Sequence, residues 1–271
     1  MGNVGLMERN GVSDEPRIAV VSLHTSPLDQ PGSGDSGGMN VFIRAAAERL
    51  SAAGVGVDVF TRARDERRPE VQELGNGSRL INIQAGPNAP VPKDELPRFL
   101  PEFLGGVLRR ARAEGSDYAL VHTHYWLSGW VGRSAREIWG VPLVASFHTL
   151  GKVKNYSLAR GERPEPPFRL SGEERVIADA DRLVAATPVE AAQLVGLYRA
   201  EPDRIRIVPP GVDHALFFPR DRGGAKARLH LADLRLLLFV GRLQAHKGPD
   251  VAVRAVAEAV ARDPGGTRDV V

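Results

Sequence analysis

The sequence predicts an α/β fold in which a parallel sheet carries helices on both faces, followed by the beginning of a second domain of the same kind. Short apolar, β-branched runs alternate with longer helical stretches from residue 17 to residue 209. This alternation is typical of successive βαβ units. After the Pro-Pro-Gly interruption at 209–211, one further strand-and-helix pattern begins.

Seven segments of the first part have the apolar character of buried parallel strands. They are 17–23, 55–61, 79–84, 118–124, 141–147, 181–187 and 204–211. Helices are expected at 39–53, 96–114, 126–140 and 188–199, and one more is expected to end near Ala180. Gly54 fits a helix C-terminal cap and Pro188 fits a first helical turn. The charged segment 151–167 is expected to be a loop.

Three regions follow from this pattern. Residues 1–16 are expected to be a disordered tail, 17–209 an N-terminal domain, and 210–271 a hinge with the beginning of a C-terminal domain. In the last region we expect a strand at 234–242, a helix at 248–262 and a strand opening at 267–271. About 60 residues are too few to bury a core of their own, so we expect this second domain to be incomplete.

Composition excludes several classes of protein. The chain has 271 residues, 42% hydrophobic and 25% charged, as is ordinary for a soluble globular protein. It has no cysteine, which excludes a disulfide scaffold, a zinc–thiolate site and a catalytic thiol. The net charge of +3 is spread along the chain, so no nucleic-acid partner is expected. No apolar run reaches membrane-span length and the N-terminus lacks a signal-peptide core, so we expect a cytoplasmic protein.

A glycine-rich loop follows the first strand. Gly32, Gly34 and Gly37 form a literal G-x-G-x-x-G. A dinucleotide fingerprint needs its first glycine directly after the strand, yet His24–Pro31 intervene, and Asp58 lies inside the next strand rather than at its end. The spacing therefore argues against a nicotinamide-dependent oxidoreductase.

The same loop has the features of another kind of ligand site. Gly37 and Gly38 expose backbone amides just before Met39, where a helix N-terminus favours an anion. Asp35 and Asn40 add polar groups suited to hydroxyls. The alternative is an ordinary surface loop, but this position is where α/β proteins bind ligands.

Histidines end three of the expected strands. His24, His124 and His148 should meet, because the carboxyl ends of parallel strands lie at one edge of a sheet. His122 and His124 share a strand face, but no third metal ligand is identifiable, and packing explains His122 equally well.

Other polar residues carry weaker signals. Tyr125 projects from a strand end and can hydrogen-bond a ligand, and Lys93 and Arg169 are isolated cations for which a solvated surface is the expected place. Arg242 and Lys247 precede a helix opened by Gly-Pro, and they fit a diphosphate clamp or a charged turn.

Several motifs together resemble glycosyltransferase family 4, whose GT-B fold has two facing Rossmann-like domains. They are VPPGVDHALFFP at 208–219, FVGRLQAHKGPD at 239–250, HTSPLDQPGSGDSGGMNV at 24–41, VHTHYWLSG at 121–129 and HTLGKVKN at 148–155. The last three resemble the branch that transfers N-acetylglucosamine from UDP-GlcNAc to 1D-myo-inositol 3-phosphate, with retention, in mycothiol biosynthesis. The likeness extends from Arg17 to the C-terminus.

The resemblance implies roles for individual residues. Residues 17–209 would be the acceptor-binding domain and 210–271 part of the donor-binding domain. His148 would lie beside the transferred sugar as the catalytic residue. The acceptor would contact His24, Asp35, Ser36, Gly37, Gly38, Met39, Asn40, Lys93, Tyr125, Thr149 and Arg169. The UDP-sugar would contact Gln30, Pro31, Gly38, Arg242 and Lys247.

The chain departs from the family pattern at its end. The uridine pocket, a pair of glutamates and the proposed Mg²⁺ ligands of the family lie beyond Val271. The resemblance therefore implies no metal ligand in this chain and no essential cofactor, and it is compatible with a homodimer and with no membrane partner. Two alternatives stay open: a family 4 enzyme of the sucrose-phosphate type, and a non-catalytic fragment that binds inositol phosphate.

Overall fold

A computed structural model describes residues 16–32, 34–158, 161–241, 243–267 and 270. The chain divides into two compact units, Met1–Lys152 with Pro166–Pro209, and Val153–Glu165 with Pro210–Val271. The tail expected at 1–16 lies outside the described residues except for Pro16. Each unit is described by itself.

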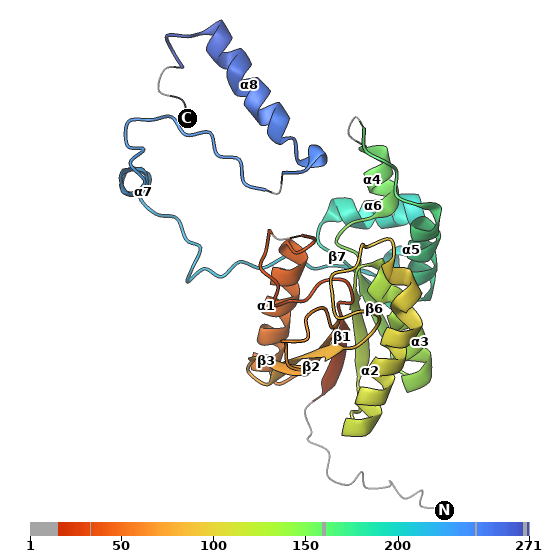
Figure 1. The fold of residues 1–271 in the computed structure, drawn as a ribbon. Helices are drawn as coiled ribbons and strands as arrows, with labels where there is room; N and C mark the ends of the chain where they lie inside the picture. The colour runs from red at the N-terminus through yellow and green to blue at the C-terminus, as the bar shows by residue number, and fades with distance from the viewer. Residues whose placement is uncertain (1–15, 33, 159–160, 242, 268–269, 271) are drawn as a thin grey trace, which may run out of the picture. The chain divides into compact units, whose positions relative to one another are not determined.

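The larger unit is built on an eight-stranded sheet in the order β3-β4-β2-β1-β5-β6-β7-β8 (Figure 1). The β3–β4 pair is antiparallel, and the other neighbours are parallel. The strands are β1 (Arg17–Val21), β2 (Gly56–Arg62), β3 (Val71–Gly75), β4 (Ser78–Ile83), β5 (Leu120–His124), β6 (Leu143–Ser146), β7 (Arg182–Ala185) and β8 (Ile205–Ile207).

Helices cover both faces of this sheet, as the sequence predicts (Figure 1). The helix α3 packs against α2 and α5, and α1 lies on the other side of the sheet. The α-helices are α1 (Gly38–Ala52), α2 (Leu100–Glu114), α3 (Trp126–Trp139), α5 (Pro167–Asp179) and α6 (Pro188–Tyr198), with 3₁₀ turns η1 (Leu96–Phe99) and η2 (Pro202–Arg204). The short helix α4 (Gly151–Tyr156) begins in the larger unit, and its residues from Val153 onward belong to the smaller one.

The core lies between the sheet and its helices. Val57 and Val59 of β2 are fully buried and pack with Ile43 and Ala47 of α1. Strands covered on both faces need apolar residues on both, which explains their continuous apolar runs. On the other face, a Cβ atom on Gly132 of α3 would lie only 2.3 Å from Thr123 Cγ2, so glycine lets α3 approach β5 closely.

The strand order places the site. The strand β1 lies between β2 and β5, and β6 is the next neighbour of β5. The chain moves outward in both directions from β1, so the sheet has its topological switch point there. The loops that follow β1, β5 and β6 leave the same edge of the sheet.

Two elements of the larger unit's sequence differ from expectation. The strand β3 was not predicted, because its residues VQELG include polar Gln72 and Glu73 and form no apolar run. It lies at the edge of the sheet, and only Leu74 of its side chains is buried. The prediction of a loop throughout 151–167 is wrong, because α4 begins at Gly151, whose amide donates to the buried carboxylate of Glu173. Glu173, 22 residues away in sequence, therefore accepts the hydrogen bond of an amide that has no partner within the helix.

The smaller unit contains α7 (Arg222–Arg228), the 3₁₀ turn η3 (Ala245–Lys247) and α8 (Pro249–Arg262). The strand predicted at 234–242 is wrong for its described residues, because only Arg235 pairs, in a single bridge with Val270. A strand needs neighbours along its length to satisfy its backbone. Of the strand opening expected at 267–271, residues 268, 269 and 271 lie outside the described part.

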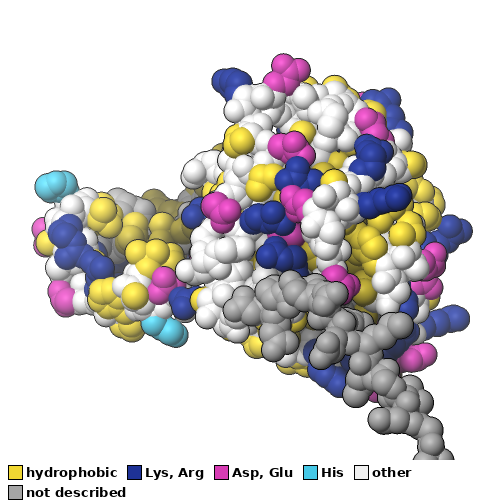
Figure 2. Space-filling model, turned by 90° about the horizontal axis from the view of Figure 1, so that it is seen from below, with side chains coloured by type: hydrophobic (Ala, Val, Ile, Leu, Met, Phe, Trp, Pro, Cys, Tyr) yellow, Lys and Arg dark blue, Asp and Glu magenta, His cyan; other side chains and the backbone are white. Residues whose placement is uncertain are grey.

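Hydrophobic side chains are exposed on the smaller unit (Figure 2, left). All residues from Leu236 to Val240 are exposed, and Leu237, Leu238 and Phe239 line an apolar groove of about 810 Å³ together with Leu243 and α8. On the larger unit, acidic and basic side chains are mixed over the face shown in Figure 2. Among the residues that the structure describes, no helix has the length and hydrophobicity needed to span a membrane.

Candidate functional site

Three loops meet at the switch point and bring together the histidines that end the strands. The rings of His24 and Tyr125, from the loops after β1 and β5, have centroids 4.3 Å apart. His124 Nδ1 and His148 Nε2, at the ends of β5 and beyond β6, are 2.8 Å apart. Phe42 of α1 contacts both imidazoles edge-on. The strand ends therefore form one polar cluster.

The backbone of two of these residues is strained. Tyr125 has φ 74° and His148 has φ 61°, a region that residues other than glycine seldom occupy. The Tyr125 amide donates to Ser146 O at 2.8 Å, which holds the turn in place. Strain of this kind persists only where the surroundings over-determine it, and it is found disproportionately at functional sites.

Two cations flank the ring of Tyr125. Lys93 Nζ lies 5.7 Å and Arg169 Cζ 5.0 Å from the ring centroid. Arg169 also donates to Thr149, at 3.1 Å to its carbonyl and 3.2 Å to Oγ1. The prediction of a solvated surface position is wrong for Arg169, which is buried beneath these contacts. Lys93 stays partly exposed and pairs with Asp35 at 2.9 Å.

The glycine-rich loop leads into α1 through Gly37. Asn40 is buried, and its side chain accepts from the Gly37 amide at 3.1 Å and donates to Ser26 O. Its amide group is therefore used to shape the loop. Met39 is partly buried and packs against the core. Gly38 is exposed and has no side chain to cover its backbone. Asp35 is exposed, and Ser36 is buried.

The carboxylate of Asp29 holds the glycine-rich loop in place. It accepts from the Ser26 amide at 2.9 Å and Ser36 Oγ at 3.4 Å. It also pairs with Arg64 and, at 2.9 Å, with Arg68, both from the segment after β2. A buried carboxylate with several donors is well satisfied, so this residue ties two loops together.

Burial keeps the imidazoles of the cluster neutral at neutral pH. Loss of solvation lowers the pKa of His24 to about 3 and that of His122 to about 4. Desolvation and then the charge of His122 lower the pKa of His148 to about 4, although the residue is exposed at one side of the cluster. The pKa of His124 is also lowered, by burial and then by the two neighbouring histidines. A neutral imidazole can both accept and donate a hydrogen bond.

The two histidines of β5 are engaged in side-chain contacts. His122 Nε2 lies 2.9 Å from Ser146 Oγ, and the rings of His122 and His124 have centroids 4.4 Å apart. Within the described ranges, no three His, Asp or Glu side chains are grouped so as to hold a metal ion.

Asp58 has a structural role in this protein. It is fully buried in β2, where its carboxylate binds Arg17 at 2.8 Å, Arg79 through two bonds of 2.8 Å, and the Tyr118 hydroxyl at 2.9 Å. It lies toward the amino ends of the strands, away from the loops of the site. A ribose therefore has no access to it, which agrees with the spacing argument against a dinucleotide site.

The residues expected to contact the UDP-sugar do not all lie in the larger unit. Gln30 and Pro31 are exposed on the loop after β1, beside the residues described above. Arg242 lies outside the described residues. Lys247 ends η3 in the smaller unit, exposed, with Gly248 at φ 66° preceding α8.

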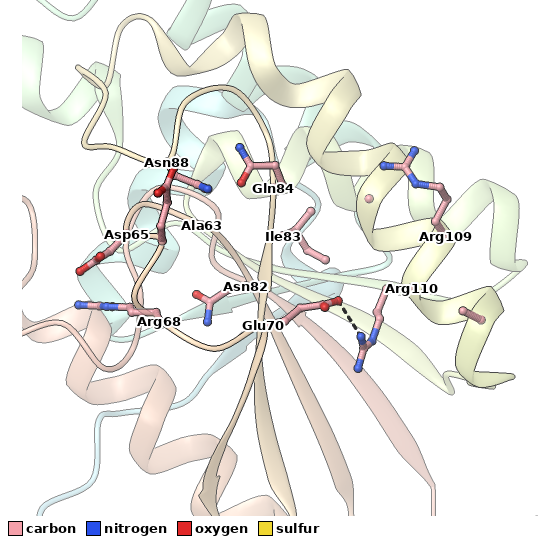
Figure 3. A pocket seen from close by; sticks show the side chains of 13 residues that line it. Ala63, Asp65, Arg68, Glu70, Asn82, Ile83, Gln84, Asn88, Arg109 and Arg110 are labelled. Carbon is pink, nitrogen blue, oxygen red and sulfur yellow. Dashed lines mark hydrogen bonds and ion pairs between the residues drawn. The ribbon is translucent and has the colours of Figure 1, made fainter.

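A separate polar pocket of about 550 Å³ opens where β4 ends, between the segment after β2 and the helix α2 (Figure 3). Glu70 and Arg110 form an ion pair across it at 2.7 Å, and amides from Asn82, Gln84 and Asn88 point toward it. None of the residues expected in the site lines this pocket.

Sequence reasoning missed the buried charges that hold the site. Besides Asp29, these are Glu173 of α5 and Arg62 at the end of β2. The Arg62 guanidinium donates to the carbonyls of Ala85, Pro87 and Ala89, at 3.3, 2.7 and 2.7 Å, and so shapes the loop that leads to Lys93. Arg62 and Glu173 stand among other charged residues in the sequence, and Asp29 stands in a loop of turn residues, so no local pattern marks any of the three as buried.

Comparison with known proteins identifies relatives of this chain. It is 54% identical over 251 residues to a D-inositol 3-phosphate glycosyltransferase of Actinosynnema mirum, covering 92% of this chain and 60% of the relative. A protein of the same name from Acidothermus cellulolyticus is 55% identical, with 56% of its length covered. The chain thus spans somewhat more than half the length of these curated relatives.

Solved structures show the same fold. A sucrose-phosphate synthase of Thermosynechococcus elongatus matches with a TM-score of 0.82 at 36% identity, over 90% of this chain and 60% of that one. HepE of Anabaena, in complex with UDP and glucose, matches with a TM-score of 0.63 at 17% identity, over 94% and 59%, and supports the fold alone. The expected α/β, GT-B class is therefore confirmed. The model of the family named Glycosyltransferase Family 4 matches residues 36–216, two thirds of the chain, and the chain belongs to that family.

Proposed function

We propose that this chain carries the acceptor site of a retaining glycosyltransferase that moves N-acetylglucosamine from UDP-GlcNAc to 1D-myo-inositol 3-phosphate. The name shared by relatives more than 50% identical supports the acceptor. Because the chain spans 56–60% of these relatives, the whole enzyme's activity and substrates are part of the proposal.

The arrangement of Lys93, Arg169, Thr149 and Tyr125 is the observation that carries the proposal. An ammonium and a guanidinium flank one aromatic ring, and the Thr149 hydroxyl accepts a hydrogen bond from that guanidinium. Charge-assisted hydrogen bonds from such groups are the strong contacts by which proteins hold phosphate. The ring of Tyr125 would form the floor of the pocket and its hydroxyl a further donor.

The neighbouring polar groups suit a polyol. Asp35 and His24 would take hydroxyls of the inositol ring, together with the backbone around Ser36–Asn40. Asp35 already pairs with Lys93, so it would be placed beside the bound phosphate. A neutral His148 would lie at the junction of acceptor and sugar and hydrogen-bond the transferred residue. Gln30, Pro31 and Gly38 would face the UDP-sugar.

The mechanism rests on orientation and charge. A phosphate held at one end of the acceptor fixes the position of the reacting hydroxyl, which converts binding energy into alignment. Arg242 and Lys247 would stabilise the diphosphate as the glycosidic bond breaks. These two residues, a homodimer and a cytoplasmic location belong to the proposal through the family resemblance.

Calorimetry on the 271-residue chain tests the acceptor directly. We expect 1D-myo-inositol 3-phosphate to bind and myo-inositol to bind at least tenfold more weakly, since the phosphate contacts are charge-assisted. Lys93→Gln should weaken phosphate-acceptor binding about tenfold. Arg109→Gln is the matched control, because Arg109 is an exposed cation of the same unit that lines the separate pocket. Equal binding of inositol with and without phosphate would refute the proposal.

A sucrose-phosphate type of acceptor is the second candidate. The structural match to a sucrose-phosphate synthase favours it, because a hexose phosphate presents the same phosphate and polyol chemistry. Preference for fructose 6-phosphate over inositol 3-phosphate in the same titration would decide for it. If the chain binds the acceptor but releases no UDP when UDP-GlcNAc is added, it is a binding fragment without catalytic activity.

A further inference from the structure

Glu173 lies at the centre of a buried hydrogen-bond network beside Arg169, one of the residues proposed to bind phosphate. It is fully buried in α5, one helical turn after Arg169. Its carboxylate accepts from Arg169 Nε at 2.8 Å, from the Gly151 amide at 3.1 and 2.9 Å, and from the Tyr198 hydroxyl. Donors from α4, α5 and α6 therefore converge on one buried negative charge.

The contact with Arg169 orients the guanidinium. Glu173 holds the Nε edge, and the Nη2 group on the other side donates to both oxygens of Thr149. A planar fork held on one edge by a carboxylate keeps a fixed direction. That direction brings the guanidinium over the ring of Tyr125.

The contact with Gly151 fixes the loop after β6. Both carboxylate oxygens receive the Gly151 amide, which directly follows the segment His148–Leu150. A Cβ atom at this position would lie 2.7 Å from Leu170 Cδ2 and 3.1 Å from Glu173 Oε2. Only glycine lets the backbone approach so closely, so the loop and the carboxylate are fitted to one another.

The contact with Tyr198 completes the network. The Tyr198 hydroxyl donates to Glu173 and accepts from the Lys152 amide at 2.9 Å. Burial, reinforced by the bond to Glu173, raises the pKa of Tyr198, so the hydroxyl remains a donor. A buried polar network with each member satisfied is rigid and specifies one arrangement.

We propose that Glu173 is a positioning residue for acceptor recognition, which holds the Arg169 guanidinium and the His148–Gly151 loop in the arrangement that receives the acceptor's phosphate. The inference rests on the proposed function, because it concerns the same phosphate pocket. Glu173 itself has no surface from which to touch a ligand, so it acts through Arg169 and Thr149.

The test compares two buried carboxylates of the same unit. Glu173→Gln keeps the shape of the side chain and removes its charge, and we expect the Kd for 1D-myo-inositol 3-phosphate to rise at least tenfold. Asp58→Asn is the control, because Asp58 is equally buried and binds two arginines and a tyrosine away from the site. It should lower the urea midpoint and leave the Kd within twofold. Fluorescence of the three tryptophans, all in α3, verifies that each variant is folded.

A double-mutant cycle separates positioning from general support. If Glu173 acts through Arg169, then Glu173→Gln should cause little further loss of binding in an Arg169→Gln background. If Glu173→Gln does not fold, Glu173→Asp serves instead, because it keeps the charge but draws it back from Gly151, and it should also raise the Kd.

Three results would overturn the inference: a folded Glu173 variant with unchanged Kd, additive effects in the cycle, or an equal loss of binding in Asp58→Asn. A wild-type chain that does not bind inositol 3-phosphate would refute the proposed function first. The two failures are therefore distinguishable.

Discussion

Mild acid should destabilise the larger unit through two half-buried histidines, His24 and His122. His24 and His122 are held neutral in the folded chain, with pKa values lowered by burial to about 3 and about 4. In the unfolded chain they titrate near 6.5. Between these values the unfolded state binds more protons, so the stability present above pH 6.5 is lost as the pH falls toward 4.

The magnitude follows from the same pKa values. From pH 7 to pH 5, each of the two histidines lowers the free energy of unfolding by about 2 kcal/mol, or about 4 kcal/mol together. His148 is omitted from this sum because it is exposed, whereas His24 and His122 are half-buried. The carboxylates add little above pH 5, since most ionise below it.

Urea unfolding at pH 7, 6 and 5, followed by tryptophan fluorescence, measures this loss. All three tryptophans lie in α3, so the signal reports on the larger unit. His122→Asn keeps a polar group near Ser146 and should remove about 2 kcal/mol of the pH dependence. A urea midpoint that does not move between pH 7 and pH 5, or a variant that keeps the full dependence, would refute the reasoning.

The remaining predictions concern stability at sites remote from the acceptor. Asp58→Asn should cost about 1.5–3 kcal/mol in urea unfolding, because it removes the buried carboxylate that accepts from Arg17, Arg79 and the Tyr118 hydroxyl; a loss under 1 kcal/mol would contradict this account. Gly132→Ala should cost about 1–3 kcal/mol, since its Cβ would lie 2.3 Å from Thr123 Cγ2 and 2.9 Å from Leu143 Cδ1. Gly196→Ala in α6, where nothing lies within 4 Å, should instead stabilise by about 0.5–1 kcal/mol. Thermal melts in which both alanine variants shift the same way would contradict the packing argument.

Local patterns were sufficient for most of the larger unit. Parallel strands covered on both faces must be apolar throughout, so β1, β2, β5 and β6 are visible as continuous runs. The edge strand β3 carries no such signal, and α4 begins because of a distant carboxylate. The described residues of 234–242 form no strand beyond the single bridge of Arg235, because apolar residues make a strand only where neighbours pair with them.

The candidate site shows the same division. Histidines at strand ends must meet at one edge of a parallel sheet, so their convergence is a consequence of topology. Whether a cation is buried depends on what packs against it. Arg169 gave no signal in the sequence, and its burial follows from Glu173, Thr149 and Tyr125.

The sequence by itself determined the α/β class, all segments of the first sheet except β3, the polar loops at its carboxyl edge and the resemblance to family 4. Only the tertiary structure decided which charges are buried and which are paired: Asp29 with Arg64 and Arg68, and Glu173 with Arg169. The reason is physical. Periodicity and turn residues act between near neighbours in the chain, whereas desolvation and ion pairing depend on distance in space.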